Sequence, residues 1–331
     1  MAKLSIFVTF LFMPSLFALD PYTKFTQLNL PPGPTGPESV ALDRFGQGPY
    51  VGVSDGRILK YKCSNIGFTD FAYTAPNRNK QLCDGTTDPN LGPTCGRPLG
   101  FSFNTKTGLL YIVDTFLGLF KVGPEGGPAT LLANSAGGVR FNFLNGVDVA
   151  PITGEVVFTD ASLVVDFRSV NSPNNPPNDS TGRLMVYSPI TQQVKVLQDG
   201  LPVPAGPVFS FDLTFVLYSD FVAQRVVKYW LIGPKANTSE VLLNLPGSPV
   251  KIKRATTLGQ FWVAVNIIVQ QPQSVTPFGY KFNSAGEVLL IKDLRAQYNN
   301  TQVNLVQEYN NGNILFVGSR KVAYVGIYTK S

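Results

Sequence analysis

The sequence predicts an all-β protein built as a six-bladed β-propeller. The 31 glycines and 26 prolines interrupt the chain too often for long helices, and no window keeps a helical spacing of apolar side chains. Short alternating or apolar runs dominate instead, as expected for β-strands. A strand–turn–strand unit recurs at intervals of about 45 to 60 residues, which is typical of propeller blades rather than of a sandwich.

The repeat is clearest in its first two copies. The first copy has an apolar strand at residues 39–43, a turn at 46–49, and strands at 50–53 and 56–61. The second copy repeats this order, with strands at residues 100–104, 108–114 and 118–122. Later copies open at residues 146–149, 207–210, 250–253 and 305–308. Six copies predict six blades around a central channel.

The N-terminus has the layout of a cleavable signal peptide. Lys3 precedes an apolar run from Leu4 to Leu19, and polar residues follow from Asp20. We therefore expect a signal peptide at residues 1–19 and a single propeller domain at residues 20–331. The apolar run is shorter than the roughly 20 residues that a membrane-spanning helix needs, although a retained anchor is the alternative. No later stretch is long and apolar enough to span a membrane.

The cysteines and sequons favour the endomembrane system, with the vacuole or the cell exterior as destination. Cys83 and Cys95 bracket a short polar loop, which suits a disulfide in an oxidising compartment. Cys63 is left over, and we interpret it as a small buried hydrophobe rather than a reactive thiol. Three N-glycosylation sequons occur in polar stretches, at Asn178, Asn237 and Asn299.

The composition excludes two kinds of function. The chain contains no histidine, so catalysis by a histidine and metal sites built on histidine are excluded. Its 27 basic residues exceed its 21 acidic ones, but they are scattered and form no stripe for nucleic acid. We expect a monomer with a small-molecule substrate or ligand, without a metal or another cofactor.

Several segments resemble plant strictosidine synthases and their strictosidine-synthase-like relatives. They are residues 82–84, 95–98, 110–114, 157–160, 182–184, 227–230 and 233–235, and the resemblance covers nearly the whole mature chain. It implies a propeller enzyme of specialised, alkaloid-type metabolism. Strictosidine synthases join tryptamine and secologanin by a Pictet–Spengler condensation, in which an iminium is attacked by the indole ring. A base must then remove a proton to restore aromaticity.

The residues at the family's catalytic positions depart from the pattern. In the family the base is a glutamate on the sixth blade, two residues beyond a histidine. Those positions fall on Asn304 and Gln302, and neither side chain is a base. Alternation places Glu308 on the same strand face as Asn304, further along the channel. Family members with the usual base also carry a glutamate there, which favours a structural role for Glu308.

The resemblance also implies a substrate pocket. The family's valine and phenylalanine that sandwich the indole fall on Val203 and Phe221, and a pocket tryptophan becomes Phe143. With Gln302, these are the expected substrate-binding residues, and simple packing is the alternative. We expect the pocket to accept a flat apolar ligand.

Related six-bladed lactonases and paraoxonases hold calcium through oxygen ligands near the channel. Glu38 and Asn145 match two of their ligand positions, but Ala205, Val250 and Lys251 do not. A lysine at the binding position of a divalent cation repels that cation, so bound calcium is not expected. Three hypotheses remain: a condensing or cyclising enzyme, a non-catalytic ligand-binding propeller, and, least favoured, a calcium-dependent lactonase or esterase.

Overall fold

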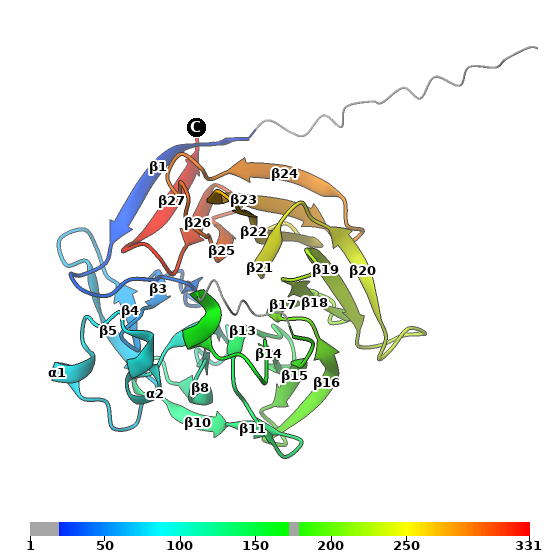
Figure 1. Cartoon of the computed structure of the whole chain (residues 1–331), viewed down its shortest axis with the longest axis horizontal. Coiled ribbons are helices and arrows are strands. Elements are labelled where there is room, and N and C mark those ends of the chain that lie inside the picture. Colours follow the sequence, from blue (N-terminus) through cyan, green and yellow to red (C-terminus); the bar gives the residue numbers. More distant parts are fainter. Residues whose placement is uncertain (1–19, 172–178) are drawn as a thin grey trace, which may run out of the picture.

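A computed structural model describes residues 20–171 and 179–331, and it confirms the six-bladed propeller (Figure 1). The proposed signal segment, residues 1–19, and the sequon at Asn178 lie outside the described residues. Each blade has four antiparallel strands, and the innermost of them lies nearest the central channel. The innermost strands are β2 (Val40–Ala41), β6 (Pro98–Phe103), β13 (Leu144–Val149), β17 (Pro204–Phe209), β21 (Ser248–Arg254) and β25 (Leu305–Tyr309).

The outer strands complete the blades in chain order. Blade 1 adds β3 (Tyr50–Gly52), β4 (Arg57–Tyr61) and β5 (Phe68–Tyr73), with β9 (Gly127–Pro128) parallel at its edge. Blade 2 adds β7 (Leu110–Asp114), β8 (Gly118–Val122) and β10 (Thr130–Ala133). Blade 3 adds β14 (Val156–Asp160), β15 (Gly182–Ser188) and β16 (Gln193–Leu201). Blade 4 adds β18 (Phe215–Asp220), β19 (Arg225–Trp230) and β20 (Ser239–Asn244). Blade 5 adds β22 (Gln260–Gln270), β23 (Gln273–Asn283) and β24 (Val288–Asp293).

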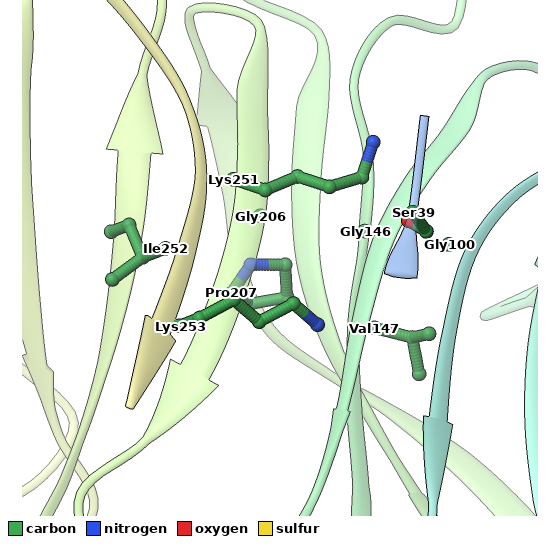
Figure 2. Close-up of a pocket in the computed structure, with 9 residues that line it drawn as sticks. All are labelled: Ser39, Gly100, Gly146, Val147, Gly206, Pro207, Lys251, Ile252 and Lys253. Carbon is green, nitrogen blue, oxygen red and sulfur yellow. The ribbon is translucent and has the colours of Figure 1, made fainter. Parts of the chain in front are cut away.

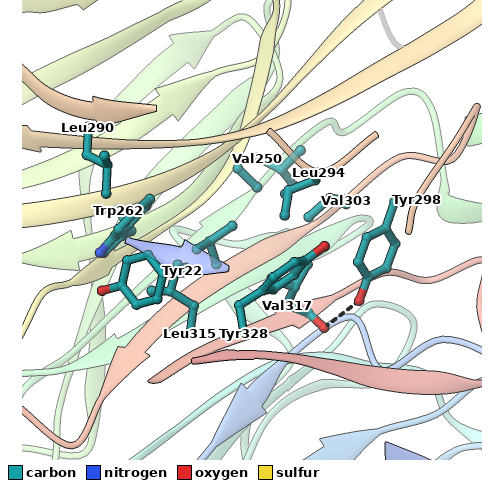
Figure 3. Packing of buried hydrophobic residues seen from close by; sticks show 12 residues of the cluster. Tyr22, Val250, Trp262, Leu290, Leu294, Tyr298, Val303, Leu315, Val317 and Tyr328 are labelled. Carbon is teal, nitrogen blue, oxygen red and sulfur yellow. Dashed lines mark hydrogen bonds between the residues drawn. The ribbon is translucent and has the colours of Figure 1, made fainter. Parts of the chain in front are cut away.

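Blade 6 joins the two ends of the described chain. It contains β25, β26 (Ile314–Gly318), β27 (Tyr324–Lys330) and, outermost, β1 (Tyr22–Asn29), which pairs antiparallel with β27. Tyr22 packs edge-to-face on Trp262 of blade 5, with ring centroids 6.1 Å apart. Figure 3 shows the buried cluster to which both rings belong, with Tyr298 donating a hydrogen bond to the Val317 carbonyl. The N-terminal strand therefore closes the ring.

Burial follows position within a blade. The innermost strands β13 and β17 are buried at every residue, because neighbouring blades cover both of their faces. The outermost strands have one face toward solvent, and β20 shows the alternation of exposed and covered side chains that this produces. The core is therefore divided among the spaces between blades.

Short helices lie in two of the connections. The loop between blades 1 and 2 contains α1 (Lys80–Cys83), η1 (Pro89–Leu91) and α2 (Gly92–Cys95). The disulfide between Cys83 and Cys95 is confirmed, with Cα atoms 5.5 Å apart. Within blade 3, η2 (Phe167–Asn171) follows β14 and lies over the middle of the ring in Figure 1. A hairpin of β11 (Ser135–Ala136) and β12 (Val139–Arg140) precedes blade 3.

Cys63 is exposed, so the expectation of a buried cysteine is wrong. It lies in the connection between β4 and β5, where its carbonyl accepts hydrogen bonds from the amides of Ile66 and Gly67, and a side chain at such a turn faces solvent. Asn237 and Asn299 are exposed in turns. No helix within residues 20–171 and 179–331 is long and apolar enough to cross a membrane.

Candidate functional site

The channel has a closed waist where the innermost strands approach one another. Gly206 has a φ of +47°, and a Cβ at this position would lie 2.3 Å from the Cα of Lys251. A Cβ on Gly146 would lie 2.7 Å from the Cα of Gly206. The space lined by these residues has no room for a water molecule. Figure 2 shows the side chains of Lys251 and Lys253 at different heights along this waist.

A buried charged cluster lies on the Lys251 side of the waist. The Glu38 carboxylate accepts hydrogen bonds from Lys251 Nζ at 3.1 Å and from Asn304 Nδ2 at 3.4 Å. Burial opposes ionisation of Glu38, but the nearby charges of Lys251, Arg320 and Arg97 lower its pKa. Glu38 is therefore the anionic centre of a cluster that is mainly cationic.

Asn304 lies in this cluster, immediately before β25, and is 3% exposed. Its side-chain Oδ1 accepts a hydrogen bond from the backbone amide of Arg320 at 3.0 Å, and its backbone carbonyl accepts one from the Lys251 amide at 3.1 Å. Gln302 accepts a hydrogen bond from the Arg320 guanidinium at 3.0 Å. The residues at the two expected catalytic positions therefore position Arg320, and an amide cannot accept the proton that a general base removes.

Glu308 lies elsewhere, so the expectation that it lies along the same channel is wrong. Its carboxylate accepts hydrogen bonds from the Tyr22 hydroxyl at 3.0 Å, the Thr256 amide at 2.8 Å and Lys281 Nζ at 2.9 Å. Tyr22 lies on the outermost strand of blade 6 and Lys281 on β23 of blade 5, so the Glu308 side chain points between these two blades and away from the channel. Burial opposes ionisation, but Lys281 and the hydrogen bonds lower the pKa of Glu308. These contacts give Glu308 a structural role.

The expected substrate-binding residues Phe143, Val203 and Phe221 come together in one apolar cluster. Phe143 and Val203 are each 4% exposed, and Phe221 packs against them. The cluster also contains Phe167 of η2, whose ring centroid lies 6.0 Å from that of Phe143. We call this group, with Leu99, Phe116, Ala161 and Val170, the aromatic cluster.

Sequence reasoning missed Arg97 and Phe167, which connect the aromatic and charged clusters. The Arg97 guanidinium lies 5.3 Å from the centroid of the Phe167 ring, and its charge also acts on Glu38. Arg97 follows Cys95 by two residues, so its place beside the disulfide was a usable signal. Phe167 had no such signal, because it stands alone in a connection without periodicity.

The donor set does not fit calcium. Calcium takes six to eight oxygen ligands, among them carboxylates. The Lys251 ammonium contacts the Glu38 carboxylate, which is the one acidic group expected to bind the ion. A cation already neutralises that carboxylate, so no step of the chemistry is assigned to a metal.

These features define a six-bladed propeller with buried charges beside an aromatic cluster at one end of its channel. Solved structures share this fold. A gluconolactonase from Xanthomonas campestris aligns with a TM-score of 0.57 at 13% identity, covering 95% of this chain and 99% of that chain. The calcium-binding protein regucalcin from Agrobacterium tumefaciens aligns with a TM-score of 0.60 at 13% identity, covering 94% of this chain and 96% of that chain.

Sequence comparison identifies the family. The strictosidine synthase family model matches residues 145–234, and the strictosidine synthase-like N-terminal model matches residues 23–61. Protein STRICTOSIDINE SYNTHASE-LIKE 12 of Arabidopsis thaliana is 41% identical over 311 residues, covering 92% of this chain and 89% of the relative. Strictosidine synthase of Catharanthus roseus is 40% identical over 298 residues, covering 88% of this chain and 82% of the relative. The chain belongs to the strictosidine synthase-like family.

Proposed function

We propose that this chain is a small-molecule-binding propeller of the secretory pathway that does not form strictosidine by the family's base-catalysed route. The observation that carries this proposal is Asn304, an amide at the position of the base, whose side chain is engaged by Glu38 and Arg320. An apolar binding site for a flat ligand lies beside Asn304 and is formed by Phe143, Val203 and Phe221.

Glu38 does not replace the missing base. It lies within 3.4 Å of the Asn304 side chain, but Lys251 is paired with it, and three cations lower its pKa. A carboxylate stabilised in its charged form is a weak proton acceptor. The final deprotonation of a Pictet–Spengler reaction therefore lacks an acceptor at this position.

The test measures binding and catalysis on the same purified chain. Titration calorimetry with indole is expected to show binding that Phe143→Ala weakens, because the substitution removes an aromatic wall. Phe45→Ala serves as the control, since Phe45 is 72% exposed in a turn of blade 1. Unchanged binding by Phe143→Ala contradicts the proposed binding site.

Catalysis is tested with tryptamine and secologanin, with product detected by mass spectrometry. No strictosidine is expected from the wild type. Formation by Asn304→Glu shows that the rest of the pocket is intact and only the base is missing. Formation of strictosidine by the wild type at a rate above the uncatalysed reaction refutes the proposal.

A condensing or cyclising enzyme of specialised, alkaloid-type metabolism is the second candidate. Its support is the 40% identity with strictosidine synthase of Catharanthus roseus. It predicts turnover of an amine and aldehyde pair other than tryptamine and secologanin, which a panel of such pairs assayed by mass spectrometry measures. Absence of any new product across the panel counts against it.

The secretory route is supported by the signal-like N-terminus and by the Cys83–Cys95 disulfide, which fits an oxidising compartment. The expected destination is the vacuole or the cell exterior. Expression in plant cells and N-terminal sequencing of the recovered protein test this, with Asp20 as the expected first residue. A product that begins at Met1 in the cytosol contradicts it.

A further inference from the structure

Buried positive charge exceeds negative charge at the channel end. Arg97 and Lys251 are 6% and 1% exposed, and Arg320 acts with them on the carboxylate of Glu38. Lys321 stands at the rim, and repulsion from Arg320 and Arg97 adds to burial in lowering its pKa. The binding site therefore lies in a positive field, which favours anions.

The charge of the buried Asp114 carboxylate acts on Arg97, but its side-chain oxygens bind groups other than the guanidinium. It accepts hydrogen bonds from the Thr74 hydroxyl and from the backbone amides of Arg97, Phe116 and Leu117. No salt bridge joins Asp114 to the guanidinium among the described residues. Burial lowers the pKa of Arg97, and Arg320 adds to this effect, while the charges of Glu38, Asp114 and Asp55 oppose it without cancelling it. The guanidinium is thus left with incomplete compensation.

The Arg97 guanidinium also has unpartnered donors. Its Nε and Nη1 atoms are buried and make no hydrogen bond within the part of the chain that the structure describes. Thr115 Oγ1, adjacent in sequence to Asp114, is unpartnered as well. Buried polar atoms in folded proteins are normally hydrogen-bonded, so unpartnered donors beside an aromatic cluster indicate a polar ligand group. Nη1 lies at the end of the planar guanidinium, where an oxygen of a carboxylate can accept a charge-assisted hydrogen bond.

We infer that the ligand of this site is a small aromatic carboxylate. Its carboxylate accepts a hydrogen bond from Arg97 Nη1, and its ring packs against Phe143 and Phe167. The inference rests on the proposed function and adds the charge of the ligand. The same field repels the ammonium group of an aromatic amine, so the site selects against amines of the size of tryptamine.

The test compares three probes that share the indole ring and differ in charge: indole-3-propionate, indole-3-propionamide and tryptamine. Titration calorimetry on the full mature chain is expected to show the anion binding at least about tenfold more tightly than the neutral amide, with the amine weakest. Equal affinity for anion and amide overturns the carboxylate inference and leaves the proposed function standing. Failure of all three probes to bind overturns both.

Variants assign the preference to Arg97. Arg97→Gln is expected to lower anion affinity by about tenfold and to change affinity for the amide by less than about twofold. Lys321→Gln, at the exposed rim, is the second variant if Arg97→Gln does not fold, and its expected loss for the anion is about threefold. Lys195→Gln, on the exposed face of β16, is the matched control and changes neither affinity. An anion preference that survives both Arg97→Gln and Lys321→Gln refutes the assignment.

Discussion

Replacing Lys253 with methionine is expected to stabilise the fold at neutral pH. Lys253 lies on β21, is 9% exposed and forms no salt bridge among the described residues. The nearby Asp148 is bound by the Arg254 guanidinium, with Nη2 and Oδ1 2.9 Å apart. Burial lowers the pKa of Lys253 to about 8; Asp148 opposes this, and Lys251 and Arg254 add to it. The ammonium is therefore a buried charge that Asp148 compensates only in part.

The pKa sets the size of the effect. A fall from 10.5 to about 8 corresponds to a cost of about 3 kcal/mol for the charged amine in the folded state. Methionine keeps most of the aliphatic length without the charge, so its packing cost is expected to stay below about 1 kcal/mol. The variant should therefore gain about 2 kcal/mol in unfolding free energy at pH 7.

The pH dependence distinguishes this explanation from better packing. Above pH 8 the folded state releases the Lys253 proton, while the unfolded state keeps it until about pH 10.4. The unfolded state binds more protons in this window, so wild-type stability rises with pH relative to the variant. Urea unfolding followed by circular dichroism at pH 7 and pH 10 measures the gap in unfolding free energy between Lys253→Met and the wild type. Lys195→Met is the exposed control. A gap that is absent at pH 7, or constant with pH, refutes the reasoning.

Three further predictions concern stability and processing. The unfolding free energy of the double variant Cys83→Ser/Cys95→Ser should be about 2–4 kcal/mol lower than that of the wild type. A reducing agent should lower the urea midpoint of the wild type to that of the variant. Glu308→Gln should lower the unfolding free energy by about 2–3 kcal/mol at pH 7. Because the pKa of Glu308 is lowered in the folded state, the stabilities of wild type and variant should converge as the pH falls through that pKa. Acid unfolding curves of the two proteins measure this convergence. Asn237→Gln and Asn299→Gln should each remove one glycan in a secretory host, seen as increased gel mobility, and unchanged mobility counts against glycosylation at that site.

The blades were predictable because their signals are local. Alternating strands and glycine-containing turns in residues 100–122 match β6, β7 and β8, since a hairpin needs only neighbouring residues. The closing strand β1 was not predicted, because its partner β27 lies about 300 positions away and pairing between distant strands leaves no local pattern.

The site was predictable only in part. Family resemblance indicated Asn304, Phe143 and Val203, and the structure brings these residues to neighbouring clusters at one end of the channel. Alternation misplaced Glu308, because Asn304 precedes β25, which begins at Leu305, and because the Glu308 side chain is turned between blades 5 and 6 by Tyr22 and Lys281. The pair of Lys251 with Glu38 joins residues 213 positions apart, a contact that depends on closure of the ring.

Closure by β1 also determines how the protein unfolds. In an open repeat array each end unit has one neighbour, so such arrays can fray from their ends. This ring has no end unit, because blade 6 packs against both blade 5 and blade 1 and its outermost strand, β1, leads along the chain into blade 1. Loss of β1 turns blades 6 and 1 into end units at once. Unfolding should therefore be a single cooperative transition that includes the loss of β1.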